Sequence, residues 1–266
     1  MFARALAPLA LAGALVLPLR ASSAQQFHYA AGTAQYRMIV SAKVSQTAMG
    51  QTNEMDVSSG QKFTMALNNQ AADTLAMTLT IDSIGSSTMM GPVPGLDKLV
   101  GQKVQAWVSP SGQYYSSKAP TGAGLEALSN VAEELTHVLP PIRVALAPGA
   151  TWTDTVSDTG TQNGVDVEKT VVSVYTVAGD TSVAGGKAWK VTRNSTAVTS
   201  GKGTMQGQAM TLEGSSKGTG LLLITPAGAF LGSTGTEDAK AKITLTDAGV
   251  EVNVGTNATS KVERVN

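Results

Sequence analysis

The sequence predicts an all-β protein, and three observations carry this prediction. Apolar and polar residues alternate with a period of two through most of the chain after residue 24. The 266 residues include 31 threonines, 28 glycines and 23 serines. Threonine favours the solvated face of a strand, while glycine and serine favour turns. Because strands with one solvated face belong to antiparallel sheets, we expect a strongly curved antiparallel sheet or an incomplete barrel.

The clearest strand covers residues 75–81, where Leu75, Met77, Leu79 and Ile81 alternate with alanine and threonine. The same alternation occurs in residues 36–44, 63–67, 241–245 and 250–254. The last two segments are joined through Asp247-Ala248-Gly249, which has the composition of a hairpin turn.

One turn motif occurs twice. Ser109-Pro110-Ser111-Gly112 and Thr225-Pro226-Ala227-Gly228 both place proline second and glycine fourth, as type I turns prefer. Their separation is about half the length of the exported chain, which indicates two duplicated β halves over residues 27–118 and 141–266. The alternative is that two such hairpins recur by chance.

Residues 119–140, between the halves, predict one amphipathic helix and its connector. Its apolar positions follow the spacing of three and four, namely Leu125, Leu128, Val131, Ala132, Leu135, Val138 and Leu139, and Pro140-Pro141 ends it. A helix with one apolar stripe must cover something. We expect it to cover the open face of the sheet or one end of a barrel.

The first 24 residues predict a secretory signal peptide. Arg4 precedes an apolar run over residues 5–19, and Ala21-Ser22-Ser23-Ala24 offers a cleavage site after Ala24. An uncleaved anchor is the alternative, because Arg20 lies close to that site. We therefore expect a periplasmic or secreted protein that is not an integral membrane protein once the signal is removed.

Composition argues against several function classes. The chain has no cysteine, 14% charged residues and a formal net charge of zero, which disfavour thiol chemistry and binding of nucleic acid. Its two histidines restrict catalysis. We therefore expect no enzymatic activity, no cofactor and no metal.

Three short motifs bear on catalysis. Gly214-Ser215-Ser216-Lys217-Gly218 matches the nucleophile-elbow pattern, but no histidine follows Ser216, and a hairpin turn is the better interpretation. Ser59 and Lys62 have the spacing of penicillin-recognising enzymes without their other motifs, and Ser59 is expected on a turn. Glu134 and His137 match half of a di-iron site, but no second helix supplies the other half.

Methionine is concentrated in the first half of the chain. Seven of the ten methionines lie between Met38 and Met90. Core filling is the plainest interpretation, and copper(I) ligation is the least supported one. The functional interpretation is a cavity for an apolar ligand, because methionine repacks easily. The residues expected to line that cavity are Met77, Met89, Met90, Leu128 and Leu135, with residues 85–95 as a loop at its mouth.

The segment from Pro141 to Trp152 resembles a signature of uncharacterised secreted bacterial β-rich proteins, in which Pro141, Val144, Gly149 and Trp152 are the matching positions. The resemblance implies no activity, and Ala150 stands where those proteins have an acidic residue. In architecture, the predicted strands and covering helix are similar to the LolA-like half-barrel carriers of lipids and lipoproteins.

The function expected from these features is non-catalytic binding of an apolar or lipid-like ligand between sheet and helix. A structural or interaction module that binds another cell-envelope protein is the first alternative. A carboxylate-based hydrolase is the second.

Overall fold

The computed structural model describes residues 26–88, 91–92, 95–122, 125, 138–162, 164–183, 186–205 and 207–265. The predicted signal peptide therefore lies outside the described residues. The strands are β1 (Gly32–Ala48), β2 (Gln51–Ala71), β3 (Thr74–Thr88), β4 (Gly91–Pro92), β5 (Lys103–Val108), β6 (Tyr114–Lys118), β7 (Thr151–Gln162), β8 (Val165–Val183), β9 (Gly186–Met205), β10 (Gln208–Ile224), β11 (Phe230–Leu245) and β12 (Val250–Val265).

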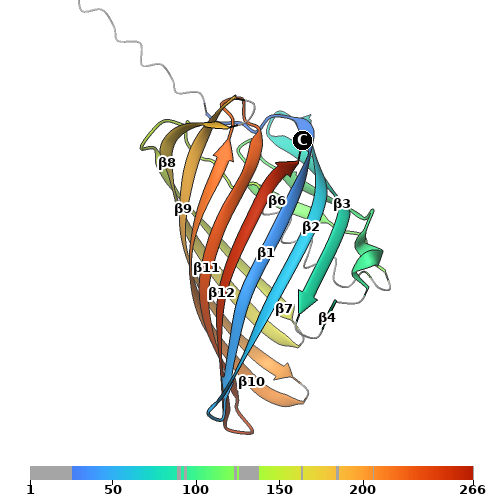
Figure 1. The fold of residues 1–266 in the computed structure, drawn as a ribbon, viewed down its shortest axis with the longest axis vertical. Coiled ribbons are helices and arrows are strands. Elements are labelled where there is room, and N and C mark those ends of the chain that lie inside the picture. Colours follow the sequence, from blue (N-terminus) through green and yellow to red (C-terminus); the bar gives the residue numbers. More distant parts are fainter. Residues whose placement is uncertain are drawn as a thin grey trace, which may run out of the picture.

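All of these strands form one antiparallel sheet, which confirms the all-β prediction (Figure 1). The strand order is β6-β5-β3-β2-β1-β12-β11-β10-β9-β8-β7, and the short β4 pairs with β3. The sheet is open, with β6 and β7 as its edges, and it is not strongly curled. The predicted antiparallel sheet is thus confirmed, and it stays open because its edge strands do not pair with each other; the expected strong curvature is not confirmed.

The predicted helix falls mainly on residues 126–137, which are outside the described residues. Of its apolar positions, Leu125, Val138 and Leu139 are described, none of them is helical, and all three pack on the core. The described residues contain one helical turn, the 3-10 helix η1 (Leu96–Leu99). No helix in the described part of the chain is long and apolar enough to cross a membrane.

The chain order shows two similar halves. Strands β1, β2, β3, β5 and β6 follow one another across the sheet, and so do β7, β8, β9, β10 and β11, with β12 between the two sets. The two Pro-x-Gly turns also have one hydrogen-bond pattern. The hydroxyls of Ser109 and Thr225 each accept a 2.9 Å hydrogen bond from the backbone N–H four residues later. These features agree with a duplication, which stays a prediction.

The sheet has an inner and an outer face, and we define the inner face as the one that carries Phe63, Leu79 and Val177. The buried core lies on this face at the upper end of the sheet in Figure 1. It combines residues from β1, β2, β3 and β5 with residues from β8, β9, β10 and β11. The alternating pattern of residues 75–81 is confirmed, since Leu75, Met77, Leu79 and Ile81 are all buried.

Irregular segments close the upper end of this core. The backbone N–H of Tyr29 donates to the carbonyl oxygen of Pro110 at 2.7 Å, and that of Ala30 donates to Gly228 at 3.1 Å. The phenol of Tyr29 donates to the carbonyl oxygen of Pro140 at 2.8 Å. The segment before β1 therefore joins both Pro-x-Gly turns and the segment before β7.

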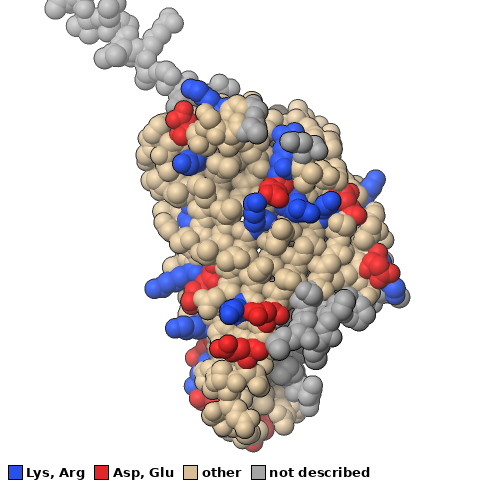
Figure 2. Space-filling view, viewed as in Figure 1, with Lys and Arg blue, Asp and Glu red and all other residues tan. Residues whose placement is uncertain are grey.

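Towards the lower end, the strands continue beyond the core as a single layer. Here the inner-face residues are half-buried and the outer-face residues are mostly exposed, as in β12 (Val250–Val265). The threonines of β7 show the predicted solvated face, because Thr151, Thr153 and Thr155 are all exposed. Lys and Arg lie interspersed with Asp and Glu on the face shown in Figure 2.

The strands are longer than the sequence indicated, and this overturns two local predictions. Ser216 lies inside β10 and Ser59 lies inside β2, so neither is on a turn. Gly214 and Gly218, expected in the same hairpin turn as Ser216, likewise lie inside β10. The predicted hairpin at Asp247-Ala248-Gly249 is confirmed, because Leu245 pairs with Val250.

Candidate ligand-binding face

Buried polar residues lie at the margins of the core. Among the described residues, the buried polar side chains belong to Gln61, Ser109, Asp154 and Ser173. Asp154 of β7 and Ser173 of β8 are register partners on the inner face. Because a buried carboxylate must be paired or hydrogen-bonded, the surroundings of Asp154 identify the first candidate functional site.

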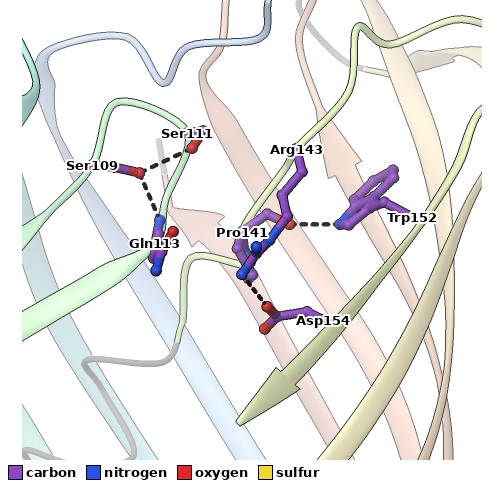
Figure 3. A network of polar contacts seen from close by, with 7 residues as sticks. All are labelled: Ser109, Ser111, Gln113, Pro141, Arg143, Trp152 and Asp154. Carbon is purple, nitrogen blue, oxygen red and sulfur yellow. Dashed lines mark hydrogen bonds and ion pairs between the residues drawn. The ribbon is translucent and has the colours of Figure 1, made fainter.

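Arg143 pairs with Asp154 from the segment before β7. One guanidinium nitrogen lies 2.6 Å from a carboxylate oxygen (Figure 3). The Arg143 side chain is 48% exposed, whereas that of Asp154 is 9% exposed. The carboxylate of Asp154 is therefore buried in the sheet, while the guanidinium of Arg143 contacts solvent. The pair therefore presents a cationic group at the margin of the inner face.

Trp152 fixes this segment against the sheet. Its indole nitrogen donates to the carbonyl oxygen of Pro141 at 2.7 Å, as Figure 3 shows. Gly149 adopts a φ of 81°, and its N–H donates to Val177 of β8 at 2.8 Å. The spacing of Pro141, Gly149 and Trp152 noted in the sequence thus has a local structural reason, because the segment folds back onto the strand that follows it.

Trp152, Tyr175 and Arg193 form one row across β7, β8 and β9. They are successive register partners on the inner face. The rings of Trp152 and Tyr175 are stacked, with centroids 5.0 Å apart and planes at 8°. This pair forms an aromatic wall directly beside the guanidinium of Arg193.

The environment of Tyr175 is dominated by burial. Burial raises the pKa of its phenol above the ordinary value of 10.0. The positive charge of Arg193 and hydrogen bonds to Ser173 and Arg193 act in the opposite direction, while the charge of Asp154 raises the pKa further. Tyr175 therefore remains neutral near pH 7 and offers a hydrogen-bonding group beside Arg193.

Arg193 has unused hydrogen-bonding capacity. Its Nε is buried and has no hydrogen-bond partner. The residue opposite it on β10 is Gly220, and a Cβ placed there would lie 3.7 Å from this Nε. The arginine side chain therefore lies over the bare backbone of β10.

Small and aliphatic side chains continue the inner face below these arginines. One row across the sheet consists, in register order, of Val156, Val171, Ala197, Ser216, Ala239, Thr256, Val44 and Met55. Most of its apolar members are half-buried, Val156 is 43% exposed, and Ala197 is buried. The inner face thus offers aliphatic surface next to a cationic and aromatic boundary.

Shallow hollows also occur near the lower end of the sheet. One of about 490 Å³ lies over β10, β11, β12 and β1 and is lined mainly by polar side chains such as Glu213, Lys240 and Lys242. Another of about 660 Å³ lies over β7, β8, β9 and β10. Among the described residues, no group of three or more His, Asp or Glu could hold a metal ion.

The structure describes only one of the sequence-predicted cavity residues. Met77 of β3 is buried in the core, where it is 1% exposed. Met89, Met90, Leu128 and Leu135 lie outside the described residues. His137 also lies outside them, and His28 is exposed.

Sequence reasoning missed the arginine-aromatic row. Its signal was present in the alternation itself. In β7, the outward threonines place Trp152 and Asp154 on the opposite face, and in β8 the same rule groups Ser173, Tyr175 and Val177. In β9, Arg193 lies two residues after Val191 and four before Ala197, so the same alternation places its charge on a largely apolar face.

Comparisons with known proteins give no family by sequence. No family model matches the chain, and no curated protein matches it. Among solved structures, the chain is similar to a DUF1329 family protein from Desulfovibrio piger ATCC 29098. That match has 9% identity and a TM-score of 0.21, and it covers 83% of each chain. A similarity this distant carries no argument about function.

Proposed function

We propose that this protein binds an amphipathic ligand with an aliphatic chain on the inner face of its sheet, without chemical conversion. The observation that carries the proposal is the row of half-buried aliphatic residues that includes Val171 and Ala239, two register rows below the Trp152–Tyr175 wall, with Asp154 and Ser173 in the row between. The proposal places the aliphatic chain on this row and the polar end at the wall.

The energetics of such binding are favourable. Each methylene group removed from water contributes about 0.8 kcal/mol, so a chain of several methylenes on this face would overcome the entropic cost of association. At Gly218 the Ser195 hydroxyl lies over the backbone, 2.8 Å from where a Cβ would stand, so this part of the inner face is already filled by the protein itself.

The proposal is tested with a neutral apolar fluorophore, N-phenylnaphthylamine, whose emission rises in an apolar site. Val171 and Val172 are neighbours in β8, both half-buried, with Val171 on the inner face and Val172 on the outer face. Val171→Asp should reduce probe binding at least about tenfold, since it places a charge on the proposed binding surface. Val172→Asp is the matched control and should retain wild-type binding.

Native mass spectrometry of protein purified from its own host gives an independent readout. A retained amphiphile that is lost in Val171→Asp, but kept in Val172→Asp, would support the proposal. A ligand-free mass together with equal probe binding by both variants would overturn it.

A further inference from the structure

We infer that Arg193, aided by Arg143, recognises an anionic head group, so that the ligand class is a carboxylate or phosphate amphiphile. This inference rests on the proposed function and specifies the charge of the ligand. It starts from the buried Nε of Arg193, which has no hydrogen-bond partner. A buried donor without a partner is unfavourable, and a bound anion would supply the acceptor.

Nearby charges favour an anion at this position. Arg193 lies on the inner face, and Asp154, the partner of Arg143, lies one register row from it on the same face. Two guanidinium groups and one carboxylate leave one positive charge. The next acid on this face is the exposed Glu237 of β11, two strands from β9, which corresponds to about 10 Å at the usual strand spacing.

The surroundings also restrict how the anion could bind. A guanidinium offers several N–H donors in a fixed plane, which matches the oxygens of carboxylate or phosphate. The Arg193 side chain lies over Gly220 of β10, with its Nε 3.7 Å from where a Cβ would stand, and the Trp152–Tyr175 wall lies on its other side. An amphiphile entering from the lower, aliphatic part of the inner face would therefore bring its head group to Arg193.

The experiment measures displacement of N-phenylnaphthylamine by dodecanoate, dodecyl phosphate and dodecanol. For the wild-type protein, we expect the preferred anionic compound, dodecanoate or dodecyl phosphate, to displace the probe at a concentration at least about tenfold below that of dodecanol. A charge-assisted hydrogen bond to the head group accounts for a difference of this size. Comparing dodecanoate with dodecyl phosphate tells which acid is preferred. In Arg193→Gln, the advantage over dodecanol should fall to about twofold or less.

Arg37→Gln is the matched control, because it removes the same charge from the outer face of β1, where Arg37 is exposed. It should leave the anionic advantage unchanged. If Arg193→Gln does not fold, the salt dependence of ligand binding by the wild-type protein tests the anionic specificity instead. Binding of dodecanoate should then weaken with rising salt while binding of dodecanol does not.

The two proposals fail in different ways. If the probe and all three compounds fail to bind, the proposed function is wrong. If dodecanoate, dodecyl phosphate and dodecanol displace the probe equally, and salt has no effect, the proposed function stands and the anionic specificity is wrong.

Discussion

The indole of Trp152 donates a 2.7 Å hydrogen bond to the carbonyl oxygen of Pro141, eleven residues earlier in the chain. Trp152 is 7% exposed, so this bond is largely shielded from water. It joins the start of β7 to the segment that carries Arg143, and that segment also donates from Ile142 to Ser111 at 2.7 Å. One side chain thus connects the edge strand β7 with the turn between β5 and β6.

Trp152→Phe should therefore destabilise the protein by about 1–2 kcal/mol, because the Pro141 carbonyl loses its partner and the aromatic contact shrinks. The measurement is urea unfolding followed by circular dichroism. Trp107→Phe is the control, since Trp107 lies on the outer face of β5 and should cost less. Equal losses in both variants would contradict the role assigned to the hydrogen bond.

The Arg143–Asp154 pair should show measurable coupling. In a double-mutant cycle with Arg143→Gln and Asp154→Asn, we expect a coupling free energy of about 1 kcal/mol, limited by the exposure of Arg143. The control is Lys187 and Asp180, which lie 3.9 Å apart with side chains 77% and 61% exposed. That pair should couple negligibly, and the larger coupling should decrease at high salt.

The sequence predicted local pairing better than the arrangement of the sheet. Alternation and turn composition located the hairpin between β11 and β12, because both signals lie within a few residues of each other. The pairing of β1 with β12 joins opposite ends of the described chain, and no local pattern encodes it. The open edges at β6 and β7 likewise depend on contacts among all the strands.

The candidate site was harder to predict for a physical reason. In the single-layer part of the sheet, the inner face carries glycine, alanine and serine, so its hydrophobicity differs little from that of the threonine-rich outer face. Ser216 and Gly218, for example, lie on the inner face of β10 although their composition indicated a turn. Methionine content indicated the core instead, where Met38, Met65 and Met77 are buried.

Gly228 is required by both its backbone and its neighbours. It has a φ of 88°, and a Cβ there would collide with the carbonyl oxygen of His28 and lie 2.9 Å from the nitrogen of Ala30. Gly228→Ala should cost at least about 2–3 kcal/mol, because left-handed strain adds to displacement of the segment before β1.

Gly249→Ala is the matched control for Gly228→Ala. Gly249 has a φ of 61° and no atom within 4 Å of the added Cβ, so only the conformational cost of about 1 kcal/mol remains. Thermal unfolding of both variants gives the comparison. A smaller loss at Gly228 than at Gly249 would show that the segment before β1 does not pack against the turn.

Tyr36 should make stability fall at alkaline pH. Burial raises the pKa of its phenol from 10.0 to about 12, and its hydroxyl donates to the carbonyl oxygen of Phe230 at 2.9 Å. The unfolded chain therefore loses this proton at lower pH than the folded chain does. The contribution is fully present below pH 10 and is lost as the pH rises from 10 towards 12, and it amounts to about 2 kcal/mol.

The measurement is the free energy of unfolding in urea at pH values on both sides of 10. Tyr36→Phe should reduce the alkaline loss, because the variant has no phenol to ionise. Phe63→Leu shrinks the ring that stacks on Tyr36 at 5.5 Å and so weakens the burial of the phenol, and it should lower stability and reduce the alkaline loss together. If Tyr36→Phe and the wild-type protein lose stability in parallel above pH 10, the phenol of Tyr36 does not cause the alkaline loss. Tyr29 and Tyr175 are then the residues to replace, because burial also raises the pKa values of their phenols.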